Sequence, residues 1–192
     1  LGGEGGHGVI VLSPNAIKRL TTFIPERPLP KIFRLVKNGR LNEGVYQGET
    51  LNTPSMFCVA DALDSLLWIK DLGGLPETIR RSNENFECLQ GWVDQRPWIE
   101  NLVSDPSNRS NTSVCLKFSD KRFVTLHQDQ KNHFVKEFVG RLEAENAAFD
   151  IKGHRNAPPG LRIWCGATIN LDDLQKLLPW LDWCFSETVS SY

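Results

Sequence analysis

The chain has 192 residues, of which 40% are apolar and 23% charged, and its formal net charge is −1. These values are typical of a folded protein with a packed core, and so small a net charge gives no overall field toward nucleic acid or a membrane surface. No apolar run approaches the length that crosses a bilayer, and no signal-peptide pattern is visible. We therefore expect a cytoplasmic protein that binds neither nucleic acid nor membrane.

The N-terminal part combines short apolar segments with a long polar one. Residues 9–12, Val-Ile-Val-Leu, form a continuous apolar run that predicts a buried strand. Ser13 is expected to cap the helix that follows, with a proline in its first turn. Residues 21–50 contain three prolines and a basic series and predict a long loop, a feature that is usually functional in a globular chain. From Met56 onward, apolar residues recur at helical spacing.

A third helix is predicted to start at Pro76 and to end before Arg96-Pro97. The stretch that follows is rich in Pro, Ser and Asn and is the best candidate for a domain boundary, which gives two parts, residues 1–96 and 97–192. Beyond it the pattern is α+β. We expect a strand, an amphipathic helix, an edge strand, a second strand and a final helix capped by Asn170, at residues 114–118, 134–142, 148–152, 161–165 and 171 onward.

Residues 153–165 place three cationic or near-cationic side chains, His154, Arg155 and Arg162, around a rigid Pro-Pro-Gly turn. Charged side chains of this kind are seldom buried in a core, but they bind a small dianion well. The planar guanidinium of arginine offers two parallel donors to a phosphate or carboxylate. The alternative is a solvated turn beside an ordinary strand.

A second candidate anion site lies at Asn52-Thr53-Pro54, just before a predicted helix. Either Thr53 simply caps that helix, or Asn52 and Thr53 add donors to a helix N-terminus that binds an anion. The glycine-rich residues 2–8 could cradle a phosphate through backbone N–H groups, or they could allow tight backbone packing. They match neither a Walker A motif nor a dinucleotide fingerprint.

The pattern holds no obvious site for catalysis or metal binding. His7, His127 and His133 have no carboxylate or cysteine partners at metal-ligand spacing, and the five cysteines form no C-x-x-C, so we expect no metal and free thiols. No Ser-His-Asp or Cys-His arrangement stands out. The residues therefore predict a protein part that holds anionic ligand groups while another segment supplies the chemistry.

Taken together, six segments resemble phosphoserine aminotransferase, a class V aminotransferase of the pyridoxal-phosphate fold type I. They are residues 1–9, 31–35, 41–44, 48–56, 110–115 and 158–166. The likeness covers nearly the whole chain in order and is nearest to the branch of alphaproteobacteria and some archaea. It implies α/β and α+β structure: the end of a large domain, then an α+β small domain with a short, mainly antiparallel sheet and helices on one face.

The resemblance also implies an activity, a cofactor and site residues. It implies a homodimer that uses pyridoxal 5'-phosphate to convert 3-phosphohydroxypyruvate and L-glutamate into O-phospho-L-serine and 2-oxoglutarate, the transamination step of serine biosynthesis. Asn52 and Thr53 would contact the cofactor phosphate of the neighbouring subunit. Arg162 would bind the substrate α-carboxylate, and His154 with Arg155 would bind the substrate phosphate.

In the family that this sequence resembles, the Schiff-base lysine comes immediately before the glycine run. We therefore expect it just upstream of Leu1, with none of the catalytic residues in this chain. The chain would then be a C-terminal portion that is inactive alone. Two alternatives stay open: another class V pyridoxal-phosphate aminotransferase, or a non-catalytic fragment that serves in dimerisation.

Overall fold

The computed structural model describes residues 9–192, and the chain divides into two units, Leu1–Asp71 and Leu72–Tyr192. The glycine run at residues 2–8 lies outside the described residues. The predicted domain boundary, between residues 96 and 97, lies further along the chain than the division between the units. A single helix, α3 (Gly74–Val93), accounts for the difference because it packs against elements of the second unit.

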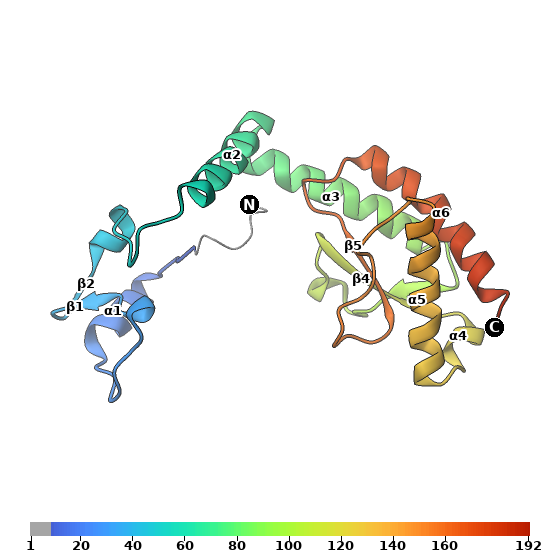
Figure 1. Cartoon of the computed structure of the whole chain (residues 1–192), viewed down its shortest axis with the longest axis horizontal. Helices are drawn as coiled ribbons and strands as arrows, with labels where there is room; N and C mark the ends of the chain where they lie inside the picture. Colours follow the sequence, from blue (N-terminus) through green and yellow to red (C-terminus); the bar gives the residue numbers. More distant parts are fainter. Residues whose placement is uncertain (1–8) are drawn as a thin grey trace. The chain divides into compact units, whose positions relative to one another are not determined.

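The first unit contains short elements joined by irregular segments (Figure 1). Its two strands form a hairpin whose turn, Asn38-Gly39, has positive φ at both residues, as a two-residue type I′ turn requires. The elements are α1 (Pro14–Thr22), η1 (Lys31–Phe33), β1 (Val36–Lys37), β2 (Arg40–Leu41), η2 (Glu43–Gln47) and α2 (Met56–Leu72), the last of which ends one residue beyond the unit.

Two helix starts in this unit test the expected caps. The prediction for α1 is confirmed, because the Ser13 side chain accepts a hydrogen bond from the Ala16 N–H at 3.2 Å. The prediction that Thr53 caps the next helix is wrong. α2 begins at Met56, and it is the Ser55 side chain that accepts from the Cys58 N–H, at 3.4 Å. The Asn-Thr-Pro-Ser sequence offers two cap residues, and the chain uses the later one.

The predicted strand at residues 9–12 is also wrong. These residues are irregular, and Val11 is 88% exposed. A strand is stabilised by hydrogen bonds to a neighbouring strand, and no segment of the described chain pairs with this one.

The second unit is built on a three-stranded antiparallel sheet of order β3-β4-β5 (Figure 1). This arrangement confirms the predicted α+β part with a short antiparallel sheet. Its elements, in addition to α3, are β3 (Ile99–Asn101), η3 (Pro106–Asn108), β4 (Ser113–Phe118), α4 (Lys121–Val124), α5 (Gln128–Ala144), β5 (Gly160–Trp164) and α6 (Leu171–Val189).

One face of this sheet carries the core. In β4, burial alternates along the strand, with Val114, Leu116 and Phe118 buried. The Phe118 ring lies 5.1 Å from that of Phe134 in α5 and 6.4 Å from that of Phe185 in α6. The predicted apolar face of α5 is confirmed: its buried residues are Phe134, Val135, Phe138, Val139 and Leu142. The helices therefore cover one face and leave the other open.

Specific contacts tie α3 into this unit at its C-terminal end. The Arg96 guanidinium donates two hydrogen bonds to the Asp182 carboxylate in α6, at 3.0 and 2.8 Å. The indole N–H of Trp92 donates to the same carboxylate at 3.1 Å.

Residues 99–101, within the stretch expected to be a linker, form β3 instead, with Ile99 buried against the core. Within residues 9–192, no helix is both long and apolar enough to cross a membrane.

Candidate anion-binding site

Arg162 lies in the middle of β5, on the open face of the sheet. Its neighbours in the strand, Leu161 and Ile163, are buried in the core. Because successive side chains of a strand point to opposite faces, Arg162 is directed away from the core, and its side chain is 37% exposed. The register places it beside Cys115 of β4.

A cavity of about 310 Å³ lies at this position, lined by Ser113, Phe149, Asp150, Ile151, Arg162 and Trp164. The Trp164 indole N–H donates to the Thr168 hydroxyl at 3.0 Å, which fixes the ring at one wall. Nη2 of Arg162 donates to Oδ2 of Asp150 at 3.2 Å. The site thus combines one guanidinium, one carboxylate and two aromatic rings, a set that suits a small organic anion.

The backbone holds the loop that precedes β5 against the strand. The Arg162 N–H donates to the Ile151 carbonyl at 2.7 Å, and the Gly153 N–H donates to the Gly160 carbonyl at 2.9 Å. The predicted edge strand at 148–152 is reduced to a single bridge between Lys152 and Leu161. Gly160 allows the close approach to β4, because a Cβ atom there would collide with the carbonyl oxygen of Leu116.

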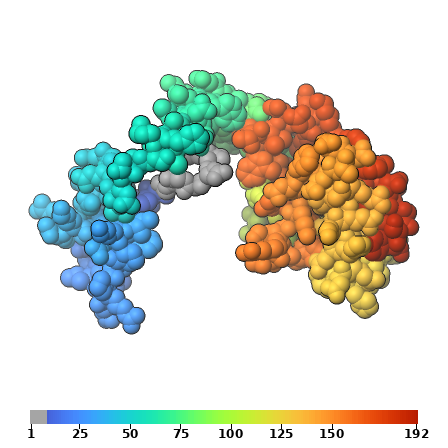
Figure 2. All heavy atoms as spheres, viewed as in Figure 1, coloured from blue at the N-terminus to red at the C-terminus, as the bar shows by residue number. Residues whose placement is uncertain are grey.

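His154 and Arg155 are exposed residues of this loop, between residues 153 and 160. The loop belongs to the segment coloured orange on the surface of the second unit in Figure 2. A tight turn orders them: the His154 carbonyl accepts from the Ala157 N–H at 2.8 Å, and His154 Nδ1 accepts from the Asn156 N–H at 3.2 Å. Neither side chain lines the Arg162 cavity. The structure therefore places the three predicted cations on one loop-and-strand segment but does not gather them in one pocket.

Asn52 and Thr53 belong to the first unit, where they lie exposed in the irregular segment before α2. Within the described part of the chain, neither side chain takes part in a hydrogen bond. An amide and a hydroxyl that are both exposed and unengaged are suitable donors for a phosphate.

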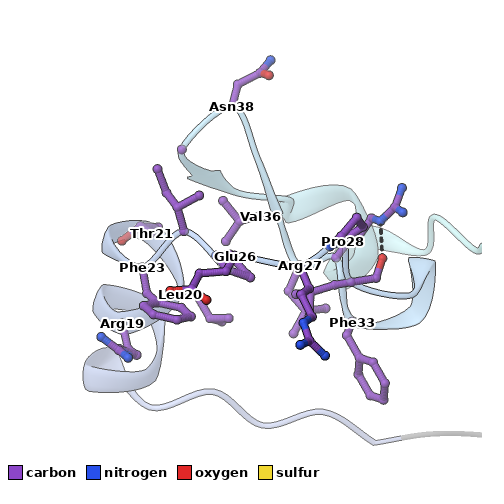
Figure 3. A pocket seen from close by; sticks show the side chains of 16 residues that line it. Arg19, Leu20, Thr21, Phe23, Glu26, Arg27, Pro28, Phe33, Val36 and Asn38 are labelled. Carbon is purple, nitrogen blue, oxygen red and sulfur yellow. Dashed lines mark hydrogen bonds between the residues drawn. The ribbon is translucent and has the colours of Figure 1, made fainter.

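A second cavity, of about 760 Å³, lies in the first unit where the long loop was predicted (Figure 3). The labelled side chains of Leu20, Phe23, Phe33 and Val36 give it an apolar lining. The arginines at its edge are partly engaged within the unit: Arg34 Nε donates to the Leu29 carbonyl at 2.7 Å, and the Arg19 guanidinium lies 4.1 Å from the centre of the Phe23 ring.

Sequence analysis missed one residue that lines the Arg162 cavity and one that holds the segment after β5. Asp150 was not singled out, because no sequence pattern links it to Arg162. Asn85 of α3 is 1% exposed and donates to the carbonyls of Cys165 and Ile169, at 3.3 and 3.0 Å, so it holds the segment after β5. The sequence could have indicated Asn85. It lies four residues before the buried Leu89, on the face of α3 where the helical spacing places apolar residues.

The cysteines of the chain are free, and two of them are deeply buried. All five cysteines are unpaired, as predicted. Burial raises the pKa of Cys165 to about 12 and that of Cys184 to about 11. Thiols with such pKa values are not nucleophiles at neutral pH. Among residues 9–192, no group of three or more His, Cys, Asp or Glu side chains is placed to hold a metal ion.

Comparison with curated proteins finds phosphoserine aminotransferases. The chain is 45% identical over 185 residues to that of Methanosarcina mazei and 44% identical over 186 residues to that of Methanosarcina barkeri. These matches cover 96% and 97% of this chain but 47% and 48% of the two relatives. The chain thus spans about half the length of the curated relatives that it matches. No family model matches it.

Solved structures agree with this result at the level of the fold. A phosphoserine aminotransferase from Bacillus circulans subsp. alkalophilus superposes with a TM-score of 0.61 at 22% identity, covering 74% of this chain and 36% of that one. A phosphoserine aminotransferase with bound pyridoxal phosphate, from Trichomonas vaginalis, gives a TM-score of 0.58 at 22% identity, covering 72% and 36%.

Proposed function

We propose that this chain, which is related to phosphoserine aminotransferases over about half of their length, is the C-terminal portion of such an enzyme. The whole enzyme would convert 3-phosphohydroxypyruvate and L-glutamate into O-phospho-L-serine and 2-oxoglutarate, in serine biosynthesis, as a cytoplasmic homodimer. The observation that carries the proposal is the 45% identity over almost the entire chain, together with an arginine cavity on the open face of the small sheet.

In this proposal each anion receptor has a separate ligand group. Arg162 binds the α-carboxylate that both amino-acid substrates share, through the parallel donors of its guanidinium. His154 and Arg155, on the neighbouring exposed loop, bind the substrate phosphate. Their separation from the Arg162 cavity supports this division, because the α-carboxylate and the phosphate are at opposite ends of phosphoserine.

Pyridoxal phosphate, when bound, supplies the electron sink for proton removal at the substrate α-carbon. This chain's contribution to binding it is limited to its phosphate. Asn52 and Thr53 fit that role as exposed donors, and we propose that they serve the active site of the neighbouring subunit. No lysine of this chain occupies the Schiff-base motif, so the proton-transferring lysine would belong to the other half of the enzyme. Pyridoxal phosphate added to this chain alone should be lost on dialysis.

A chimera tests the proposal directly. The C-terminal half of the Methanosarcina mazei enzyme is replaced by this chain, and the transfer of the amino group from O-phospho-L-serine to 2-oxoglutarate is measured. We expect transamination of phosphoserine. A chimera that retains pyridoxal phosphate but transaminates only amino acids without a phosphate would favour another class V aminotransferase, for which His154 and Arg155 would have no partner.

A role in assembly is the second candidate, and α2 favours it. This helix has no buried residue, and its exposed apolar side chains are Met56, Phe57, Val59, Leu63, Leu66, Leu67 and Trp68. A helix of this kind is normally covered by other protein. If the chain alone sediments as a dimer and Leu63→Asp makes it monomeric, while the chimera has no transaminase activity, the assembly role is preferred.

A further inference from the structure

We propose that Asp150 determines the ligand specificity of the Arg162 site by occupying the guanidinium whenever no ligand is bound. A ligand then enters by exchanging its own carboxylate for that of Asp150. This inference rests on the proposed role of Arg162 and adds a residue that sets which groups bind there and how tightly.

The geometry shows a carboxylate already placed where a ligand carboxylate would bind. Asp150 and Arg162 line the same cavity of about 310 Å³, and Oδ2 of Asp150 lies 3.2 Å from Nη2 of Arg162. Among the described residues this is the only hydrogen bond that the Arg162 guanidinium donates to a side chain. The internal carboxylate therefore stands in for the α-carboxylate of an amino acid.

The backbone brings the two residues close together. The Arg162 N–H is hydrogen-bonded to the carbonyl of Ile151, the residue next to Asp150, at 2.7 Å. Asp150 itself has a φ of 53°, in the left-handed region that Asp and Asn tolerate better than most other residues. The chain thus fixes the Cα of Asp150 beside the strand that carries Arg162.

The pair is also built to exchange. The Asp150 side chain is 89% exposed and contacts Arg162 through a single oxygen. Exposed ion pairs of this kind are weak, whereas an incoming carboxylate can use two parallel N–H donors. A carboxylate ligand therefore displaces Asp150. A neutral group of the same size does not, because it would be a poorer partner for the guanidinium than the Asp150 carboxylate. Removal of the internal competitor should tighten carboxylate binding by about two- to fivefold.

The test measures binding of 2-oxoglutarate to the 192-residue chain, with the indole N–H signal of Trp164 as the reporter, since this residue lines the cavity. Asp150→Asn keeps the size and the tolerance for positive φ but removes the charge, and we expect it to lower the Kd about two- to fivefold. The matched control is Glu100→Gln, which removes a carboxylate paired with Lys117 at 3.1 Å on the same face of the sheet. It should leave the Kd unchanged.

A double-mutant cycle separates this inference from the proposed function. In an Arg162→Gln background, Asp150→Asn should have no effect on the Kd. If Asp150→Asn binds 2-oxoglutarate no more tightly than the original chain while Arg162→Gln weakens binding, the competitor role of Asp150 is wrong and Arg162 keeps its proposed role. Equal tightening by Asp150→Asn and Glu100→Gln would also overturn it, as a general charge effect. Absence of measurable binding to every variant would overturn both.

Discussion

The two units of the chain differ most in where their apolar side chains lie. From residue 9 to residue 71 no residue is buried, although this unit contains nearly all of α2, a helix rich in apolar residues. The second unit buries a continuous core between its sheet and the helices α3, α5 and α6. The second unit therefore has a core of its own, whereas the apolar residues of the first are of the kind that other protein covers. This contrast agrees with the finding that the chain spans about half the length of the curated relatives that it matches.

The largest expected effect tests this contrast with one residue type in two helices. Phe134 of α5 is fully buried, and Phe57 of α2 is 82% exposed. Phe134→Ala should lower the free energy of unfolding by about 3–5 kcal/mol, because it leaves a cavity in the core. Phe57→Ala in the isolated chain should change it by less than about 0.5 kcal/mol. Urea unfolding measures both, and equal losses would show that the first unit has a core after all.

A smaller effect concerns the polar anchor inside the second unit. Asn85→Leu should destabilise the chain by about 1–3 kcal/mol, because the carbonyls of Cys165 and Ile169 lose their buried donor. The control is Asn83→Leu, two residues away on the exposed side of α3, which should have little effect in the same thermal unfolding measurement. If both variants are equally stable, Asn85 does not hold the segment after β5.

The smallest effect depends on pH. The Arg122 side chain and backbone N–H, both hydrogen-bonded to Asp120, keep the pKa of that carboxyl below its usual range. A carboxyl with a lowered pKa stabilises the folded state above its unfolded pKa, and the contribution is lost as the pH falls through the folded pKa. Asp120→Asn should therefore cost under about 1 kcal/mol at pH 7.

This cost should shrink as the pH falls below about 4, the ordinary pKa of an aspartate. Urea unfolding at several pH values between 7 and 2.5 gives the difference in the free energy of unfolding between the two proteins. A difference that stays constant over this range would show that the charge of Asp120 contributes nothing and that only its hydrogen bonds to Arg122 matter.

The sequence predicted the second unit better than the first for a physical reason. The alternation in β4 and the apolar stripe of α5 are local patterns that the chain itself satisfies by burial. The run at residues 9–12 has an equally apolar pattern, but a strand also needs a partner, and the pattern does not say whether one is present. β3 was missed because it has only three residues, within a stretch rich in Pro, Ser and Asn, and an alternating pattern cannot be detected over so short a segment.

The candidate site was partly predictable for a similar reason. Arg162, His154 and Arg155 were identified because cations around a rigid turn are unusual in sequence. Asp150 could not be identified in that way, since its contact with Arg162 depends on the pairing of residues 151–153 with β5 and on a positive φ. Pairing across a loop is set by tertiary structure, which a local pattern does not encode.

The most direct test of the account compares two arginines in the chimeric enzyme. Arg162→Ala should weaken the apparent binding of phosphoserine and of glutamate alike, by about 1.5–3 kcal/mol or ten- to hundredfold, because both carry the α-carboxylate. Arg155→Ala should weaken the apparent binding of phosphoserine by a similar factor and leave that of glutamate nearly unchanged. The measurement is kcat/KM for each substrate. Equal losses for both substrates in Arg155→Ala would contradict the assignment of the exposed loop to the substrate phosphate.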